Sequence, residues 1–379
     1  MKINGLPQRT IWFDEEQQAV RIIDQTLLPH HFNILSLNSL DAACHAITTM
    51  QVRGAPLIGV TAAFGVYLAL RDGETDLSAV CERLLATRPT AVNLRWALEC
   101  VQAELSPLWG PIQAGVSTVP SIEPTQVRIE AALALALWLA DEDAAACSAI
   151  GDHGLELLQQ AWFTKLTADP TAVSLNILTH CNAGWLATVD WGTALAPIYK
   201  AHSKGIPIHV WVDETRPRNQ GAFLTAWELQ QEGIPHTVIV DNAGGHLMQH
   251  GEVDLCIVGS DRTTATGDVC NKIGTYLKAL AAFDNDIPFY VALPVSTIDF
   301  SLSDGVKEIP IEQRHGSEVS HIQGLNELGE LSRVQVMTSH SAVNNFGFDV
   351  TPARLVTALI TERGVFAPNR ESLQVLAPL

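Results

Sequence analysis

The chain has 379 residues, of which 47% are apolar and 17% charged, a composition typical of a globular protein with a large core and about two domains. Asp and Glu number 41 against 23 Lys and Arg, so the formal net charge is −18. This balance disfavours a nucleic acid or an anionic membrane as a partner, because both require a basic surface. The longest apolar run, Ala131 to Ala140, is far shorter than the ~20 residues that span a bilayer, and it predicts a buried helix.

The N-terminal segment and the cysteines indicate a cellular compartment. Residues 1–16 lack the apolar stretch and the small-residue cleavage site of a signal peptide. The seven cysteines include no C-x-x-C pair, which argues against a disulfide framework and against a zinc site. We therefore expect a cytoplasmic enzyme with reduced thiols and no metal.

The first half of the chain predicts a small β element followed by helices. Thr10–Phe13 and Ala19–Ile23 flank a polar stretch, as in a hairpin. Helical patterns follow from Ser39 or Asp41 to Val52, from Pro56 to Gly73, from Leu77 to Ala86 and from Val92 to Leu105. Residues 109–125 are rich in Pro, Gly, Ser and Thr and predict a surface loop.

A long helical stretch connects the two halves. It is expected from about Val127 to Gln160, with an interruption or a bend near Gly151 and Gly154. On this basis we assign residues 1–150 to an N-terminal domain of a β-hairpin and helices, and residues 151–379 to a C-terminal domain.

The second half alternates short β-rich runs with helical patterns. The β-rich runs are Val173–Leu178, Ile208–Val212, Thr237–Val240, Leu255–Val258 and Phe289–Leu293, and the helical patterns are Gly184–His202, Gly221–Gln231, His246–His250 and Lys272–Phe283. This alternation is the signature of βαβ crossovers. The sequence therefore predicts an α/β fold with a parallel sheet covered on both faces, although the strand order stays open.

Small, polar and ionisable residues follow four successive predicted strands, where ligands bind in open α/β sheets. Cys181 follows the first strand; a helix starting there would lower its thiol pKa, and the alternative is a small buried hydrophobic residue. Asp261 follows the fourth strand, either as a turn former or, if apolar walls enclose it and raise its pKa, as a general acid. The convergence of such residues predicts a ligand site at these strand ends.

Several further ionisable residues lie among turn residues. Five arginines do so: Arg53, Arg88, Arg216, Arg218 and Arg262. Arginine suits bidentate phosphate binding, and the alternative for each is a surface salt bridge with the surplus acids. His180 is expected to be a hydrogen-bonded strand-end residue rather than a metal ligand. Asp213 and Glu214 could form a carboxylate pair, but we expect them to be structural and to pair with Arg216 or Arg218.

Two phosphate-binding signatures are missing from the sequence. It contains neither G-x-G-x-x-G after the first of these strands nor G-x-x-x-x-G-K-[ST], which disfavours a dinucleotide enzyme and a P-loop ATPase. The residues alone thus indicate an α/β enzyme acting on a small phosphorylated substrate, with a cysteine and an aspartate as candidate acid–base groups. They leave the reaction type open.

Seven long segments carry a family resemblance. They are MQVRGAPLIGVTAAFG, TRPTAVNLRWAL, ILTHCNAGWLAT, VDETRPRNQGAFLTAWEL, DNAGGHLM, VGSDRTTATGDVCNKIGTY and FDVTPARLVTALITERG. They resemble the family of the methylthioribose-1-phosphate isomerases and the regulatory subunits of translation initiation factor 2B. The resemblance begins at Asp24–Pro29 and covers nearly the whole chain. It implies an N-terminal domain with a small β element plus helices, a Rossmann-like C-terminal domain and a homodimer.

The resemblance also implies an activity and a site. The activity is the conversion of S-methyl-5-thioribose 1-phosphate, an aldose phosphate, into the ketose S-methyl-5-thioribulose 1-phosphate in methionine salvage, without a metal or nucleotide cofactor. Cys181 and Asp261 match the family's catalytic pair. Its phosphate- and sugar-binding positions match Arg53, Gly54, Ala55, Arg88, Gln220, Asn271 and Lys272, which leaves Arg216 and Arg218 with supporting roles. A non-catalytic binding subunit is the remote alternative, because the regulatory subunits lack the catalytic pair.

Three segments depart from the common family forms. The stretch after the aspartate resembles R-x-x-A-N-G-D in the family, whereas residues 262–268 read RTTATGD. PVSTIDF at 294–300 and NNFGF at 344–348 also differ. We expect these segments to lie near the substrate, so 5-deoxyribose 1-phosphate or another 5-substituted ribose 1-phosphate stays open as a substrate. A second phosphate on the sugar would call for another basic cluster, and none is obvious.

Overall fold

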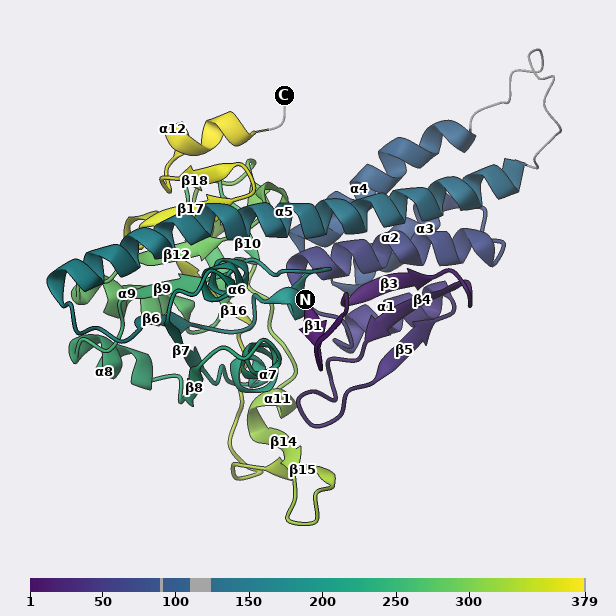
Figure 1. The fold of residues 1–379 in the computed structure, drawn as a ribbon. Helices are drawn as coiled ribbons and strands as arrows, with labels where there is room; N and C mark the ends of the chain where they lie inside the picture. Colours follow the sequence, from purple (N-terminus) through teal and green to yellow (C-terminus); the bar gives the residue numbers. More distant parts are fainter. Residues whose placement is uncertain (89–90, 110–123, 378–379) are drawn as a thin grey trace.

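The structure of the protein is a computed structural model that describes residues 1–88, 91–109 and 124–377. Strands and helices of the N-terminal half pack together beside a C-terminal half built on a large sheet (Figure 1). The N-terminal elements are β1 (Lys2–Ile3), β2 (Leu6–Pro7), β3 (Ile11–Asp14), β4 (Ala19–Ile23), β5 (Ile34–Leu37), α1 (Leu40–Thr48), α2 (Ala55–Arg71), α3 (Leu77–Thr87), α4 (Val92–Leu105) and the 3-10 helix η1 (Ser106–Trp109).

The N-terminal half has the predicted β element and helices. The hairpin of β3 and β4 is confirmed, and β5, which the sequence did not predict, pairs antiparallel with β4 as a third strand. Ser39 caps α1 by accepting a hydrogen bond from the Ala42 amide at 3.1 Å, and the helix ends at Thr48, short of the predicted Val52. Helix α2 is apolar around its whole circumference and forms the centre of this half's core.

Helix α5 (Pro124–Ala168) joins the two halves as one uninterrupted helix of 45 residues, which is about 68 Å long (Figure 1). The predicted interruption is therefore wrong. Gly151 and Gly154 instead lie where α6 (Leu195–Ser203) packs closely against α5, since a Cβ on Gly154 would come within 2.3 Å of Pro197 Cγ. The proposed domain boundary at residue 150 falls inside this helix. The predicted loop at 109–125 lies almost entirely outside the described residues.

The C-terminal half is built on a seven-stranded sheet in the order β18-β17-β12-β9-β6-β7-β8, parallel except for β18. Its elements are β6 (Leu175–Thr179), η2 (Trp185–Ala187), α6 (Leu195–Ser203), β7 (Ile208–Asp213), the π-helical turn η3 (Gly221–Thr225), α7 (Ala226–Gln231), β8 (His236–Ile239), α8 (Ala243–Gln249), β9 (Leu255–Val258), α9 (Thr275–Asp284), β12 (Phe289–Ala292), η5 (Ala353–Leu355), β17 (Ala358–Thr361), β18 (Gly364–Phe366), α12 (Arg370–Leu373) and η6 (Gln374–Leu376). All five predicted strands are confirmed to within two residues.

The sheet is doubly wound, which confirms the predicted α/β class and the Rossmann-like domain. The chain fills β6, β7 and β8 toward one edge and then returns to place β9, β12 and β17 on the other side of β6. Alternate strand residues face two separate cores: Ile177 and Ile257 pack with α5, α6 and α7, whereas Leu178 and Val258 pack with α8 and α9. The strand order reverses between β6 and β9, and this switch point is where such sheets bind ligands.

Two segments predicted as α-helices are only partly α-helical in the structure. The segment Gly184–His202 is not one helix: η2 ends at Ala187, and α6 begins only at Leu195. Between them the backbone turns through positive φ at Trp191 and Gly192, a conformation that no helix contains. The segment Gly221–Gln231 is helical, but it begins with the π-helical turn η3.

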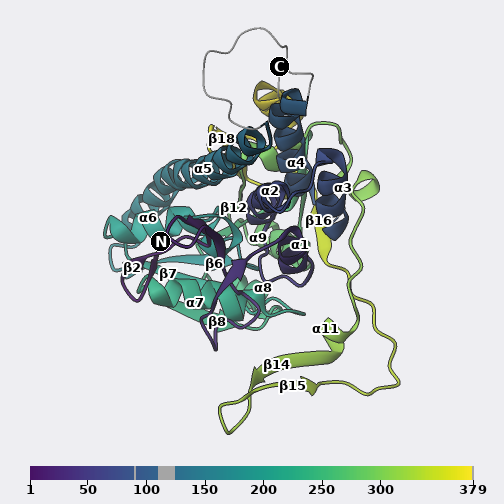
Figure 2. The ribbon, with the colours of Figure 1, turned by 90° about the vertical axis from the view of Figure 1, so that its right-hand side faces the viewer.

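A second, four-stranded sheet has the order β13-β10-β11-β16. Its strands are β13 (Ile298–Asp299), which follows η4 (Val295–Thr297), β10 (Arg262–Thr264), β11 (Val269–Lys272) and β16 (Phe348–Thr351). Between β13 and β16 the chain forms α10 (Gly305–Glu308) and then an arm, residues 309–347, with α11 (Ser317–Ser320) and the hairpin of β14 (His321–Leu325) and β15 (Leu331–Gln335). Figures 1 and 2 show that hairpin extending away from the rest of the molecule. None of the helices within the described ranges has both the length and the apolar character needed to cross a membrane.

Candidate active site

One pocket lies at the switch point of the large sheet, where β6 leads into Cys181 and β9 leads into Asp261. The structure brings together here all the residues that the resemblance assigns to a site: Arg53, Gly54, Ala55, Arg88, Cys181, Gln220, Asp261, Asn271 and Lys272. The first four come from the N-terminal half, and the others follow strands β6, β7 and β9 or lie on β11. Both halves of the chain are therefore needed to complete the pocket.

Arg53 and Gly54 enter the pocket at the N-terminus of α2. Gly54 has φ 97°, and a Cβ on it would come within 2.2 Å of the Ala187 carbonyl oxygen, so only glycine allows this approach. Arg53 is only 6% exposed and donates hydrogen bonds to the Asn182 side-chain oxygen and, at 2.7 Å, to its carbonyl oxygen. Its buried Nε has no partner, which leaves a donor for a ligand. The dipole of α2 adds to the attraction for an anion here.

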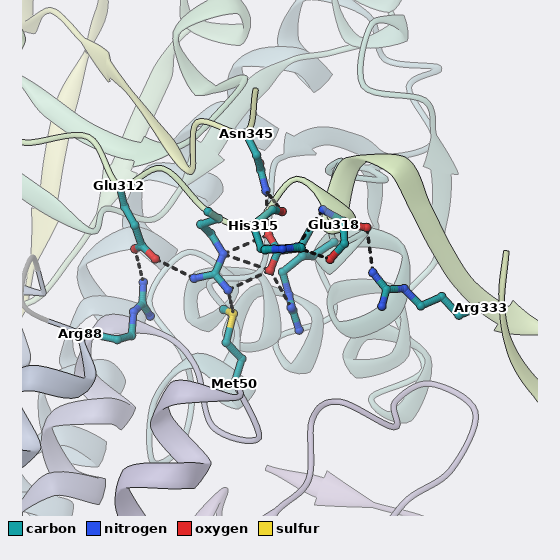
Figure 3. A network of polar contacts seen from close by, with 10 residues as sticks. Met50, Arg88, Glu312, His315, Glu318, Arg333 and Asn345 are labelled. Carbon is teal, nitrogen blue, oxygen red and sulfur yellow. Dashed lines mark hydrogen bonds and ion pairs between the residues drawn. The ribbon is translucent and has the colours of Figure 1, made fainter. Parts of the chain in front are cut away.

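Arg88 reaches the pocket from the C-terminal end of α3 and is held by the arm. Its Nη2 donates to Glu312 Oε2 at 3.2 Å, and its buried Nε has no partner. Glu312 also pairs with Arg314 at 2.7 Å, and Arg314 pairs with Glu318 at 2.8 Å. Figure 3 shows this chain of ion pairs between Arg88 and the arm. An anion bound by Arg88 would therefore compete with the Glu312 carboxylate.

Lys272 and Asn271 lie on β11 and line the pocket from the C-terminal half of the chain. Both are more than nine-tenths buried. The Lys272 ammonium lies 4.8 Å from the centre of the Phe348 ring, and burial lowers its pKa, while Cys181 and Asp261 raise it. Asn271 donates to Thr275 Oγ1 at 3.0 Å, which fixes its amide. These residues add a third cation and a polar group to the pocket.

Cys181 is held in a strained position directly beyond β6. Its φ is 66°, its amide donates to Thr215 Oγ1 at 2.8 Å, and its thiol lies 3.4 Å from Gln220 Oε1, an acceptor. Burial raises the pKa of the thiol, although Lys272 and Arg53 oppose the shift. The predicted lowering of this pKa is wrong because burial outweighs the cations and because no helix begins at the next residue.

Asp261 is the carboxyl group of the pocket. Burial raises its pKa, against the attraction of the nearby Lys272, Arg88 and Arg53. The shift has the direction expected for a general acid, and apolar side chains such as Ile58 and Phe348 line the space beside the carboxyl together with Arg88. A carboxylic acid and a thiol thus face a cavity that contains three cationic side chains.

Other residues singled out in the sequence lie outside this pocket. His180 is a hydrogen-bonded strand-end residue, as predicted: its ring nitrogens lie 2.9 Å from Asp213 Oδ2 and 2.9 Å from the Ile273 carbonyl oxygen. Asp213 pairs with Lys278 at 3.2 Å and with His180, so its predicted pairing with Arg216 or Arg218 is wrong.

One group of side chains in the described ranges has the spacing of metal ligands: His180, Asp213 and Asp241. Lys278 already contacts this group, because its ammonium pairs with Asp213 and donates to the Asp241 backbone carbonyl oxygen. The absence of a metal from the reaction stays a prediction.

Arg216 and Arg218 contact the arm instead of the pocket. Arg216 donates to the Val319 carbonyl oxygen at 2.7 Å, and Arg218 pairs with Glu318 at 3.0 Å. Arg262 lies near Asp299, at 3.9 Å. Of the five arginines that the sequence context grouped, two line the pocket, Arg53 and Arg88. Arg216, Arg218 and Arg262 contact residues outside it.

The three departures from the family pattern differ in their distance from the pocket. Residues 263–268 do not line it: residues 263 and 264 lie on β10, and residues 265–268 form the turn between β10 and β11. The expectation that this first segment lies near the substrate stays a prediction, since only the residue before it, Asp261, lines the pocket. Pro294 and Phe348, from the other two segments, do line the pocket.

Two residues of the pocket and the arm beside it were not predicted from the sequence. Asn182, which holds Arg53, and Ser260 both line it, and each stands next to a residue that had been singled out. The arm was missed altogether, because the ion pairs that connect it to Arg88 join residues 224 positions apart.

A doubly wound sheet with cations, a thiol and a carboxyl group at its switch point defines an α/β protein that binds a small anionic ligand. The sequence profile of the initiation factor 2 subunit family matches residues 51–368. The chain belongs to this family.

Its relatives include enzymes and translation factors. Proteins named methylthioribose-1-phosphate isomerase from Rhodospirillum rubrum and Methylobacterium nodulans are 58% and 59% identical to it, over 100% of this chain and 94% and 98% of theirs. Among solved structures, 5-methylthioribose 1-phosphate isomerase from Pyrococcus horikoshii OT3 has a TM-score of 0.78 at 36% identity, covering 98% of this chain and 96% of that one. Translation initiation factor eIF-2B, subunit delta, from A. fulgidus has a TM-score of 0.75 at 36% identity, covering 98% and 99%.

Proposed function

We propose that this protein is an aldose–ketose isomerase that converts S-methyl-5-thioribose 1-phosphate into S-methyl-5-thioribulose 1-phosphate, a step of methionine salvage. The observation that carries the proposal is the single pocket in which a carboxyl group of raised pKa and a thiol face three cations. The names of relatives that are 58% and 59% identical over the full chain support the same activity.

The cations bind the phosphate in this proposal. Arg53 and Arg88 each keep a buried Nε without a partner, and Lys272 adds a third positive charge. Gly54 and Ala55 place the N-terminus of α2 against the phosphate, and Gln220 and Asn271 bind the sugar. An anion is favoured here because the cations are already desolvated and fixed before it arrives.

The acid–base pair opens the sugar ring and moves a hydrogen. A sugar phosphorylated at C1 has no free anomeric hydroxyl, so Asp261 donates its proton to the ring oxygen as the bond between that oxygen and C1 breaks. A hydrogen then moves from C2 to C1, assisted by Cys181, while the 2-hydroxyl loses its proton. C2 is oxidised to a carbonyl, C1 is reduced to a CH2 that bears the phosphate, and the proton lost balances the proton gained.

Two routes for the hydrogen fit this pair. In a cis-enolate route the C2 proton is removed and a proton is added at C1, so it can exchange with solvent. In a hydride shift it moves directly and does not exchange. Reaction in deuterium oxide separates them: deuterium at C1 of the ketose supports the enolate, and its absence supports the shift.

The test of the function compares two substrates under the same conditions. Methylthioribose 1-phosphate and 5-deoxyribose 1-phosphate are each incubated with the protein, and ketose formation is followed. A higher kcat/KM for the first supports the proposal; a higher value for the second assigns the enzyme to another 5-substituted ribose 1-phosphate. Turnover of neither would contradict the isomerase and favour a non-catalytic binding subunit.

We also propose that the chain acts as a homodimer in the cytoplasm, in line with the family resemblance. Light scattering at micromolar concentration is expected to give about twice the mass of 41.0 kDa. A mass of one chain would contradict the dimer.

A further inference from the structure

A buried carboxylate lies directly behind the pocket and has no part in the chemistry above. Glu228, on α7, is fully buried and accepts four hydrogen bonds. Its donors are Asn182 Nδ2 at 2.9 Å, the Trp185 amide at 2.9 Å, the Leu186 amide at 3.1 Å and the Tyr199 hydroxyl at 2.6 Å. A carboxyl group of this kind is costly to bury, and its four hydrogen-bond donors offset that cost.

The contacts of Glu228 determine which way the Asn182 amide points. Asn182 Nδ2 donates to Glu228 and, at 3.2 Å, to Thr225 Oγ1, so both of its hydrogens are used behind the pocket. The Asn182 side-chain oxygen therefore faces Arg53 and accepts from its Nη1, while Nη2 donates to the Asn182 carbonyl. With both terminal nitrogens held, the buried Nε of Arg53 has no partner.

We infer that Glu228 is a positioning residue for phosphate binding: through Asn182 it fixes the Arg53 guanidinium in the orientation that binds the substrate's phosphate. The inference rests on the proposed function for the identity of that phosphate ester. Glu228 and Thr225 lie three positions apart across the junction of η3 and α7, which places both acceptors on Asn182.

The electrostatics and packing around Glu228 agree with this role. Its negative charge raises the pKa of Arg53 against the lowering caused by burial, and so helps to keep the guanidinium charged. Gly184 contributes by its size, since a Cβ there would come within 1.8 Å of Glu228 Oε2. The position of the carboxylate thus depends on the absence of a side chain at Gly184 as well as on its four hydrogen-bond donors.

Glu228→Gln keeps the size of the side chain but replaces one carboxylate oxygen, an acceptor, by an NH2 group, which is a donor. A glutamine NH2 would face either the Trp185 amide or the Leu186 amide, both donors, and in the second case also Asn182 Nδ2. Tyr199→Phe is the matched control. It removes one hydrogen bond from the same carboxylate but leaves Asn182 and Arg53 untouched.

The experiment measures binding of inorganic phosphate to the whole protein by calorimetry, beside unfolding midpoints and isomerase kinetics of both variants. Because a charge-assisted hydrogen bond is lost, Glu228→Gln is expected to raise the Kd of phosphate and the KM about tenfold, with kcat changed less than about threefold. Tyr199→Phe is expected to change Kd less than about twofold, even where it lowers the unfolding midpoint.

The inference would be overturned by no phosphate binding by the wild type, by an unchanged Kd in Glu228→Gln, or by the same rise in both variants. A fall in kcat at constant KM would also overturn it, because the carboxylate would then act on the chemistry. Failure of the proposed function looks different, since the wild type would bind phosphate and respond to Glu228→Gln yet form no ketose.

Discussion

Asp261→Asn tests the assignment of the general acid. The substitution keeps the shape of the side chain and removes the proton that would be given to the ring oxygen. Burial raises the pKa of Asp261, while Lys272, Arg88 and Arg53 act in the opposite direction. The raised pKa keeps the acid form populated at higher pH than an exposed aspartate allows.

The expected loss of rate follows from the role of the acid. General acid catalysis contributes about 10²- to 10⁴-fold, equivalent to about 2.7–5.5 kcal/mol of barrier, so kcat of the variant should fall by that factor. The assay is the initial rate of ketose formation at saturating substrate across a pH series. Wild-type kcat should decline as pH rises through the raised pKa of Asp261, and the residual rate of the variant should not.

The folding stability of Asp261→Asn should not fall with its rate. A carboxyl whose pKa is higher in the folded than in the unfolded state loses stability as pH rises from the unfolded to the folded pKa, and this penalty remains above both. Asparagine does not ionise, so the variant's unfolding midpoint at neutral pH should equal or exceed that of the wild type. A variant that keeps its rate within about threefold would contradict the role of Asp261 as the acid, and a variant that unfolds well below the wild type would contradict its raised pKa.

Three further substitutions or treatments probe the pocket. Gly54→Ala should lower the free energy of unfolding by about 2–5 kcal/mol, measured in urea, because its Cβ would meet the Ala187 carbonyl at 2.2 Å at positive φ; a stable variant would contradict the close approach. Glu312→Gln should lower KM about fivefold by releasing Arg88 from its ion pair, whereas a higher KM would mean that Glu312 positions Arg88. Cys181 should react with iodoacetamide at pH 8 at least about tenfold more slowly than free cysteine, since burial raises its pKa; mass spectrometry showing rapid labelling there would refute this.

The strands and their ends could be predicted from sequence because their signals are local. Short β-rich runs followed by turn residues located β6 and β9 to within two residues, and thus placed Cys181 and Asp261 at the ends of two strands. That these strands are neighbours could not be predicted, since spacing along the chain does not determine strand order. The observed order makes them adjacent at the switch point.

Two glycines led to a wrong prediction because tertiary packing, and not the local backbone conformation, requires them. Gly151 and Gly154 suggested a break, but they are required for contact with α6, and a helix tolerates them when packing supplies the stability. The segment after Gly184 has helical composition, yet its amides are capped by Glu228 from another element. Such a partner leaves no local signal.

Electrostatic properties of the site depend on burial, which the sequence does not give. A helix N-terminus was expected to lower the Cys181 pKa, and the depth of the residue raises it instead. Likewise Glu228 looks like an ordinary surface glutamate of the helix WELQQ, although it is fully buried.

The isomerisation of methylthioribose 1-phosphate in this pocket can be followed on the sugar itself. Carbon-13 NMR of the sugar, incubated with the wild-type protein, tests it most directly. The C1 signal of the aldose is expected to disappear as a C2 carbonyl signal of the ketose appears. Unchanged aldose signals at stoichiometric enzyme would contradict it.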